Sequence, residues 1–451
     1  MKAKRTRCCL PLFLILFVLS GSYALAAAPE TDGSPSSVSE VDALIRSMPD
    51  DWPQGPEITS PCAIVMDADS GTILYAKNAT RQHYPASTTK IMTALLAIEN
   101  GTLTDTVFFS NTAVNTLPPG SSHIAMKVGE ELSLQDCLYG LLLPSANEVA
   151  NALAEYTSGS IEAFVQQMNE RAAQIGTVQS HFSNPTGLHD DTHYTCAYDL
   201  ALIMRECMQN STFRTIDSAA TYIIPATNKT EQPRPIGSTH NMLRSGSEYY
   251  DSRVTGGKTG WTQESGRNLI TCAYNGSLHL IVVTLGAETP YQYTDTEKLL
   301  DFAFESFSGC SPAGQDSAYG AQTGANLLNL PRTCLQLFTL DEDSRIVLPK
   351  GISFDALTSE TVSGADGSTL VRYRYRGYPV GTAHLLNLDL SSVDTGTDDS
   401  LMPEDIRPLY HLNLWYVVLA AAALLLLVLI ILQIRYSRRP KITFRKKRFR
   451  K

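Results

Sequence analysis

After residue 26 the sequence has no closely spaced cysteines, and no internal repeat at a fixed period appears anywhere in it. Its nine cysteines are scattered over 451 residues, and the seven that follow residue 26 are an odd number without the short spacing of metal sites. This pattern indicates neither a cysteine-bound metal nor a disulfide framework. We expect these cysteines to be mostly buried apolar side chains, as free cysteines usually are.

Acidic residues are missing from both ends of the chain. Residues 1–26 hold four basic side chains and residues 435–451 hold ten. The other 22 basic side chains and all 45 acidic ones lie between, so the central part carries a net charge of about −23. Such a body repels phosphates, and we therefore expect no nucleic-acid partner.

The first 26 residues have the layout of a secretory signal peptide. A basic start is followed by an apolar run over residues 10–19 and by small residues that end in Ala24-Leu25-Ala26. We predict that residues 1–26 are removed. An uncleaved N-terminal anchor is the alternative, although the apolar run is short for a membrane span.

A second apolar segment, residues 412–434, is long enough to cross a hydrocarbon layer of ~30 Å as a helix. Trp415 and Tyr416 stand at one boundary, and the basic residues 435–451 fit a cytoplasmic tail. The sequence thus predicts a single-pass protein of the cell membrane, with its acidic body on the extracellular side.

The body is predicted to be α+β. Residues 63–67 and 72–76 flank turn residues as in a hairpin, and two further apolar strands over 268–274 and 279–285 face each other across a short turn. Helical periodicity lies between these strand groups, with one helix through Ile161 to Ile175 and another through Leu200 to Cys207. Strands at both ends with helices between them predict one sheet closed by the two ends of a domain.

Shorter alternating runs after residue 334 predict a separate small β-domain. The predicted order is therefore a polar spacer (27–57), the α+β domain (58–307), a linker (308–324), the small β-domain (325–392), a polar stalk (393–411) and the membrane helix (412–434).

Ser87 and Lys90 form an S-x-x-K pattern at the start of an apolar helical run that follows Pro85. If Ser87 begins that helix, Lys90 lies one turn further on the same face, where its amine can take the hydroxyl proton. A helix-capping serine beside a solvated lysine has the same pattern, so the motif alone does not decide between the two interpretations.

Two further short motifs follow. Ser145-Ala146-Asn147 comes after an apolar run broken by Pro144, and Lys258-Thr259-Gly260 lies in a glycine-rich strand that another backbone or a substrate can approach. Taken separately, each is equally compatible with an ordinary helix cap or a strand bulge. The order S-x-x-K, S-D-N and K-T-G, however, is the known signature of penicillin-binding proteins and class A β-lactamases, and all three occur here in that order, the second as Ser-Ala-Asn.

Longer segments around these motifs also match a family pattern. They include residues 84–93, 143–150, 182–188, 193–201, 240–243 and 257–260. Over residues 58–305 the sequence resembles the low-molecular-mass penicillin-binding proteins, the D-alanyl-D-alanine carboxypeptidases of peptidase family S11. The resemblance implies a serine β-lactamase/transpeptidase-like fold with an antiparallel sheet and helices, a peptidoglycan stem peptide as substrate, and β-lactam antibiotics as covalent inhibitors.

The same resemblance implies a role for each motif residue and requires no metal or cofactor. Ser87 is the nucleophile, Lys90 its base, and Ser145 the hydroxyl that passes the proton to the leaving amine. The residues that the resemblance implies contact the substrate are Asn147, Lys258, Thr259, Gly260 and Trp261. Burial and the charge of Lys258 are expected to lower the pKa of Lys90.

One departure from the family pattern concerns the segment that begins with Gly286-Ala287. Many relatives carry an arginine soon after it, whereas no Arg or Lys precedes Lys298 here; Arg267 is a possible substitute or an ordinary surface residue. D,D-endopeptidase activity therefore stays open beside carboxypeptidase activity. A β-lactamase is disfavoured because no E-x-x-L-N stretch follows Ser145, and a catalytically silent wall-binding scaffold because the motif residues are intact.

Overall fold

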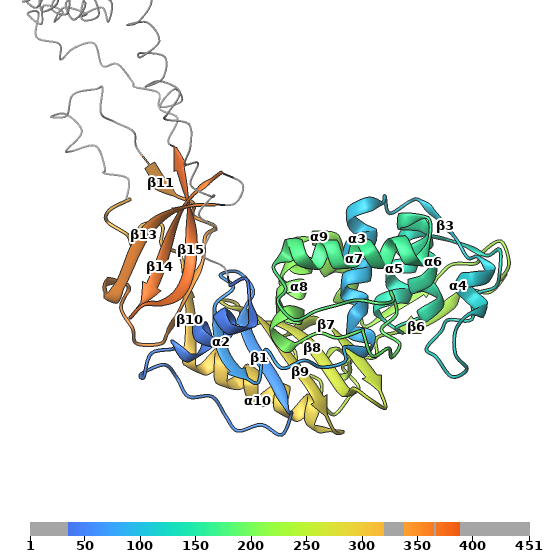
Figure 1. Ribbon diagram of the computed structural model, residues 1–451, viewed down its shortest axis with the longest axis horizontal. Coiled ribbons are helices and arrows are strands. Elements are labelled where there is room, and N and C mark those ends of the chain that lie inside the picture. Colours follow the sequence, from blue (N-terminus) through green and yellow to red (C-terminus); the bar gives the residue numbers. More distant parts are fainter. Residues whose placement is uncertain (1–34, 320–337, 365–366, 388–451) are drawn as a thin grey trace, which may run out of the picture. The chain divides into compact units, whose positions relative to one another are not determined.

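The computed structural model describes residues 35–319, 338–364 and 367–387 (Figure 1). The predicted signal peptide, stalk, membrane helix 412–434 and basic tail lie outside these ranges. Within the described ranges, no helix combines the length and apolar character that a membrane crossing needs.

A five-stranded antiparallel sheet forms the centre of the larger α+β part. Its strand order is β2-β1-β9-β8-β7, so the N-terminal hairpin of this domain joins its last three strands through the pairing of β1 with β9. This arrangement confirms both predicted hairpins and the closure of one sheet by the two ends of the domain. The strands are β1 (Cys62–Asp67), β2 (Ile73–Lys77), β7 (Val254–Thr262), β8 (Gly266–Tyr274) and β9 (His279–Ala287).

Both faces of this sheet are covered, and β1 is accordingly buried at every position. Because side chains alternate along a strand, Ile64 and Met66 point into the core shared with the helical region, while Ala63 and Val65 point to the opposite face. Helix α10 (Tyr291–Ser306) packs on that opposite face (Figure 1).

The helical region carries the two motifs that precede the sheet's last strands. Its helices α7 and α8 coincide with the two helices predicted from periodicity. The helices are α3 (Lys90–Asn100), α4 (Asn111–Asn115), α5 (Leu134–Leu142), α6 (Asn147–Ser158), α7 (Ile161–Ile175), α8 (Ala197–Gln209) and α9 (Ser211–Asp217). Two small hairpins complete it, β3 (Thr106–Phe108) with β4 (Glu131–Ser133) and β5 (Thr221–Ile224) with β6 (Arg234–Gly237).

A second antiparallel sheet follows, with the order β10-β12-β15-β14-β13 and β11 paired to β15. Its strands β11, β12, β14 and β15 lie in the alternating runs from which a small β-domain was predicted. Its first strand, however, lies partly in the segment predicted as a linker, because residues 307–310 pair with β12. The strands are β10 (Phe307–Cys310), β11 (Phe338–Leu340), β12 (Ile346–Pro349), β13 (Leu357–Ser363), β14 (Thr369–Tyr375) and β15 (Tyr378–Asn387).

The segment predicted as a polar spacer, 27–57, differs from that expectation where it is described. Residues Val38–Arg46 form helix α2, capped by Ser37, and Val41 is completely buried. Trp52 is also buried and donates its indole N–H to the Leu74 carbonyl at 3.2 Å. A few apolar side chains therefore fix this segment to the domain, although its overall composition is polar.

The six described cysteines are free, and five of them are buried. This agrees with the expectation that they act as apolar side chains. Cys334 lies outside the described residues.

Candidate active site

Ser87 lies in the 3₁₀ turn Ala86–Thr89, and Lys90 is the first residue of α3. The serine therefore precedes the α-helix instead of beginning it as expected from the sequence. In a 3₁₀ turn, side chains three residues apart eclipse each other. The Lys90 Nζ atom consequently lies 3.0 Å from Ser87 Oγ.

Lys90 is fully buried and has three oxygen neighbours. Besides Ser87 Oγ, its Nζ contacts Asn147 Oδ1 at 2.7 Å and the Thr186 carbonyl at 2.6 Å. Burial first, and the positive charge of Lys258 second, hold the pKa of Lys90 well below its ordinary value, although the charge of Glu148 opposes this. A neutral amine can donate its two hydrogens to the two carbonyl oxygens and turn its lone pair to the Ser87 hydroxyl.

The second motif meets the first through Asn147. Its residue Ser145 has a left-handed backbone, with φ of +67°, which is uncommon for a residue other than glycine. The Ser145 Oγ atom is buried and has no hydrogen-bond partner among the described residues. A buried hydroxyl without a partner is costly, so this group is available to a substrate atom.

The third motif lies on β7, and Gly260 is the point of contact with the first. A Cβ atom added at Gly260 would stand 2.9 Å from the Pro85 carbonyl oxygen and 3.1 Å from the Thr88 nitrogen. Only a residue without a side chain lets β7 approach the Ser87 turn this closely. Thr259 Oγ1, one residue earlier, lies 2.6 Å from Thr239 Oγ1.

Lys258 also belongs to β7. Its side chain is buried, and its Nζ donates to the Thr259 carbonyl at 3.1 Å. Burial lowers the pKa of Lys258 to about 8, while the nearby Asp217 carboxylate acts in the opposite direction. Burial in turn raises the pKa of Asp217 to about 7. Lys258 therefore remains mostly protonated at neutral pH and can hold an anion.

Gly257 explains why the strand before Lys258 is rich in glycine. Its φ is +142°, and its N–H donates to Asp217 Oδ2 at 2.6 Å. A Cβ atom there would stand 2.1 Å from the Ile270 carbonyl oxygen and 2.8 Å from the His240 ring. Asp217 thus holds β7 through the Gly257 N–H. Sequence reasoning missed it, because a single acid outside the motifs carries no recognisable signal.

The Thr186 carbonyl is delivered by a loop that Asn184 organises. The Asn184 Oδ1 atom accepts hydrogen bonds from the Thr186 N–H, the Thr186 hydroxyl and the Gly187 N–H. Gly187 has φ of +81°, and a Cβ atom there would stand 1.9 Å from the Ala86 carbonyl oxygen. This loop is one of the segments that match the family pattern, but a backbone carbonyl leaves no residue type from which its role can be predicted.

His193 supports the same loop from the other side. Burial lowers the pKa of His193 to about 4, so its imidazole is neutral at physiological pH. The Ser183 N–H donates to Nδ1 at 3.1 Å, so the proton is on Nε2, which donates to Thr89 Oγ1 at 2.8 Å. The segments 182–188 and 193–201 therefore fix the turn that carries Ser87.

The model of the peptidase S11 family, D-alanyl-D-alanine carboxypeptidase, matches residues 50–289, just over half of the chain. This chain belongs to that family. D-alanyl-D-alanine carboxypeptidase DacF of Bacillus subtilis is 34% identical over 251 residues, which are 54% of this chain and 62% of DacF. DacC of Escherichia coli is 32% identical over 283 residues, which are 60% of this chain and 67% of DacC.

Solved structures share the fold of this S11 chain. The Streptomyces K15 DD-transpeptidase matches with a TM-score of 0.52 and 28% identity, over 56% of this chain and 99% of that one. Penicillin binding protein 6B from Escherichia coli matches with a TM-score of 0.56 and 26% identity, over 74% of this chain and 97% of that one. The fold is thus an α+β transpeptidase-like domain followed by a β-sheet domain.

Trp261 and Arg267 form the exposed edge of the S11 site. Trp261 follows the K-T-G motif, and 57% of its surface is exposed. The Arg267 guanidinium lies 5.2 Å from the Trp261 ring centroid, and its Nε donates to Thr289 Oγ1 at 3.2 Å. Arg267 therefore lies between K-T-G and the segment that lacks the family arginine.

Among the described residues, no group of three or more His, Cys, Asp and Glu could hold a metal ion.

Proposed function

We propose that this S11 chain is a serine-type D-Ala-D-Ala carboxypeptidase that removes the terminal D-alanine from peptidoglycan stem peptides. The observation that carries the proposal is the 3.0 Å contact between Ser87 Oγ and the buried Nζ of Lys90. The family and the convergence of three motifs on this contact support it further. β-Lactams are then covalent inhibitors that acylate the same hydroxyl.

In the first step, neutral Lys90 takes the Ser87 proton while Ser87 Oγ attacks the carbonyl carbon of the penultimate D-alanine. The carbonyl oxygen becomes negatively charged in the tetrahedral intermediate. The backbone N–H groups of Ser87 and Trp261 are the proposed donors to this oxygen, and each such donor typically contributes about 3–4 kcal/mol.

Breakdown of the intermediate cleaves the C–N bond and leaves the peptide as an ester on Ser87. The Ser145 hydroxyl, which has no hydrogen-bond partner among the described residues, is the group that we propose passes a proton from Lys90 to the leaving amine. Asn147 holds Lys90 and contacts the peptide backbone. A water molecule then attacks the ester carbonyl and loses a proton to Lys90. When this second tetrahedral intermediate breaks down, Lys90 returns the proton to Ser87 Oγ and the shortened peptide is released.

Lys258 and Thr259 are the proposed binding site of the terminal carboxylate. With a pKa of about 8, Lys258 is charged at neutral pH and attracts a carboxylate. Gly260 allows this strand to lie beside Ser87, so the carboxylate and the scissile carbonyl can be bound together.

Cross-linked peptides are a second candidate substrate, because no Arg or Lys lies between Gly286 and Lys298 to select a terminal carboxylate. The deciding assay measures D-alanine release from a pentapeptide against cleavage of a cross-linked dimer. We expect the pentapeptide to react faster and a fluorescent penicillin to label the protein covalently. Preferential dimer cleavage would indicate an endopeptidase, fast release of hydrolysed penicillin would indicate a β-lactamase, and absence of labelling would indicate a scaffold.

We also propose that the chain is exported and anchored in the cell membrane by residues 412–434, with the catalytic domain outside. Protease added to intact cells is expected to digest the body and to leave the basic tail, residues 435–451, protected. Antibodies against a tag inserted directly after residue 26 and against a tag at the C-terminus would report the fragments. Protection of the body and loss of the tail would reverse this topology.

A further inference from the structure

Glu148 is a buried carboxylate beside the catalytic centre that none of the steps above uses. It follows Asn147, whose Oδ1 contacts Lys90 Nζ at 2.7 Å, and only 2% of its surface is exposed. Glu148 Oε1 accepts the Ile124 N–H at 2.7 Å, whereas Oε2 has no hydrogen-bond partner among the described residues.

The start of α6 is joined to residues 122–124 by two bonds that run in opposite directions. The Asn147 N–H donates to the Ser122 carbonyl at 2.8 Å, while the Ile124 N–H donates to Glu148. Helix α6 has no side-chain cap at its N-terminus. The Glu148 carboxylate lies in its first turn, where the positive end of the helix dipole favours a negative charge. Together these contacts fix the backbone at Asn147, from which the side-chain amide extends to Lys90.

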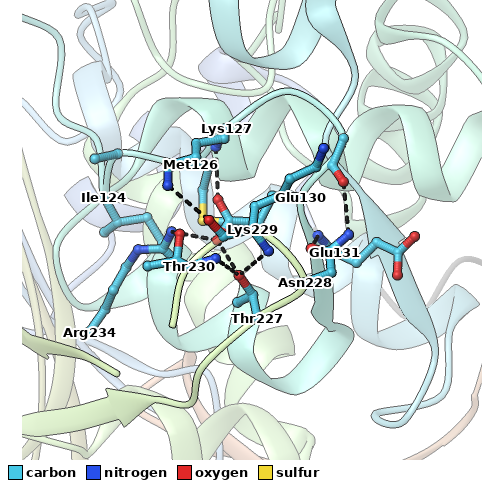
Figure 2. A network of polar contacts seen from close by, with 12 residues as sticks. Ile124, Met126, Lys127, Glu130, Glu131, Thr227, Asn228, Lys229, Thr230 and Arg234 are labelled. Atoms are coloured by element: carbon cyan, nitrogen blue, oxygen red, sulfur yellow. Dashed lines mark hydrogen bonds and ion pairs between the residues drawn. The ribbon is translucent and has the colours of Figure 1, made fainter. Parts of the chain in front are cut away.

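The segment that contacts Glu148 is itself fixed on its far side, as Figure 2 shows. Glu130 is buried and accepts hydrogen bonds from the Lys127 N–H, the Thr227 hydroxyl and the Arg234 guanidinium. Asn228 Oδ1 accepts the Glu131 N–H at 3.0 Å. Because this network ties residues 127–131 to 227–234, the Ile124 N–H has little freedom to leave Glu148.

A buried carboxylate with an unpaired oxygen is costly unless positive charge is near. Lys90 on α3 supplies such positive charge when it is protonated. Lys258 on β7 in turn disfavours the protonated form of Lys90. Other titratable groups near this centre include His193 and His240, which burial keeps neutral by lowering the pKa of each to about 4, and Asp217 of α9, which acts on Lys258. Glu148 therefore acts on Lys90, as Asp217 acts on Lys258.

Building on the proposed function, we propose that Glu148 is a positioning residue with two effects on Lys90. Its Oε1 fixes the start of α6, which carries the Asn147 side chain that Lys90 contacts, and its negative charge favours the charged form of Lys90. The first effect needs the length of the side chain, and the second needs only its charge.

The experiment measures the second-order rate constant of acylation by benzylpenicillin against pH. In Glu148→Gln the amide oxygen can still accept the Ile124 N–H, but the negative charge is gone, so charged Lys90 is less stable. We expect the acidic limb of the profile to move to lower pH by about half a unit or more. Glu148→Asp keeps the charge but shortens the reach, so we expect a rate roughly tenfold lower or more at every pH, with the limb unmoved.

Glu155→Gln is the matched control, because Glu155 lies on the same helix and binds Ser110 away from Lys90. It should change neither the rate nor the limb, and thermal unfolding should show all three variants folded. A Glu148→Gln limb that coincides with the wild type, or a Glu148→Asp limb that moves equally far, would overturn the inference alone. A wild-type protein that is not acylated at any pH would overturn the proposed function as well.

Discussion

Replacing Lys90 with alanine is expected to slow acylation by benzylpenicillin roughly 10²–10⁴-fold, the range that a general base usually contributes. The reason is that Ser87 Oγ then has no amine within hydrogen-bond distance to take its proton. The fold should be retained, because the substitution removes an amine whose charged form is disfavoured at this buried position. Labelling kinetics and thermal unfolding together measure both effects.

Ser87→Ala is the negative control of this assay, since it removes the proposed nucleophile and should not be labelled. Lys298→Ala is the matched control, because the Lys298 side chain is half exposed and lies outside the three motifs. It should be labelled at the wild-type rate. Labelling of Lys90→Ala at that same rate would remove Lys90 from the mechanism, while loss of folding in Lys90→Ala would show that its amine has a structural role.

The motif residues could be predicted from the sequence because their spacing is local or tied to regular elements. Ser87 and Lys90 are three residues apart, and any turn of helix brings such side chains together. The α7 and α8 helices and the β8–β9 hairpin carry strong periodicity that survives in the folded chain.

The groups that sequence reasoning missed act through long-range contacts. The Thr186 carbonyl reaches Lys90 across 96 positions of the chain, and Asp217 reaches Gly257 across 40. A backbone carbonyl has no residue-type signature, and a single acid at a helix end looks like an exposed residue. Only the fold shows that both are buried beside the motifs.

Helix α2 was missed for a different physical reason. Its polar flanking residues suggested a spacer, yet one buried side chain, Val41, and the buried Trp52 after it are enough to fix the segment. Hydrophobic burial of a few large side chains contributes about 1.5–3 kcal/mol each, which outweighs a polar average composition.

Replacing Gly187 with alanine is expected to destabilise the protein and to abolish most acylation. A left-handed backbone costs about 1–2 kcal/mol for a residue other than glycine. The added Cβ would also overlap the Ala86 carbonyl oxygen at 1.9 Å, so the loop must move away from the Ser87 turn. Lys90 then loses the Thr186 carbonyl, and the melting temperature should fall by roughly 4 °C or more.

Gly159→Ala separates the cost of the left-handed backbone from the effect of the overlap with the Ser87 turn. Gly159 has nearly the same left-handed backbone, φ of +79°, but no atom lies within 4 Å of an added Cβ. This control therefore carries the backbone cost without the overlap, and it should lose some stability while keeping wild-type acylation. If Gly187→Ala were acylated as fast as Gly159→Ala, the Thr186 loop would not be required to hold Lys90. Loss of acylation in Gly187→Ala alone, with both variants folded at the assay temperature, would place the requirement at the contact between this loop and the Ser87 turn.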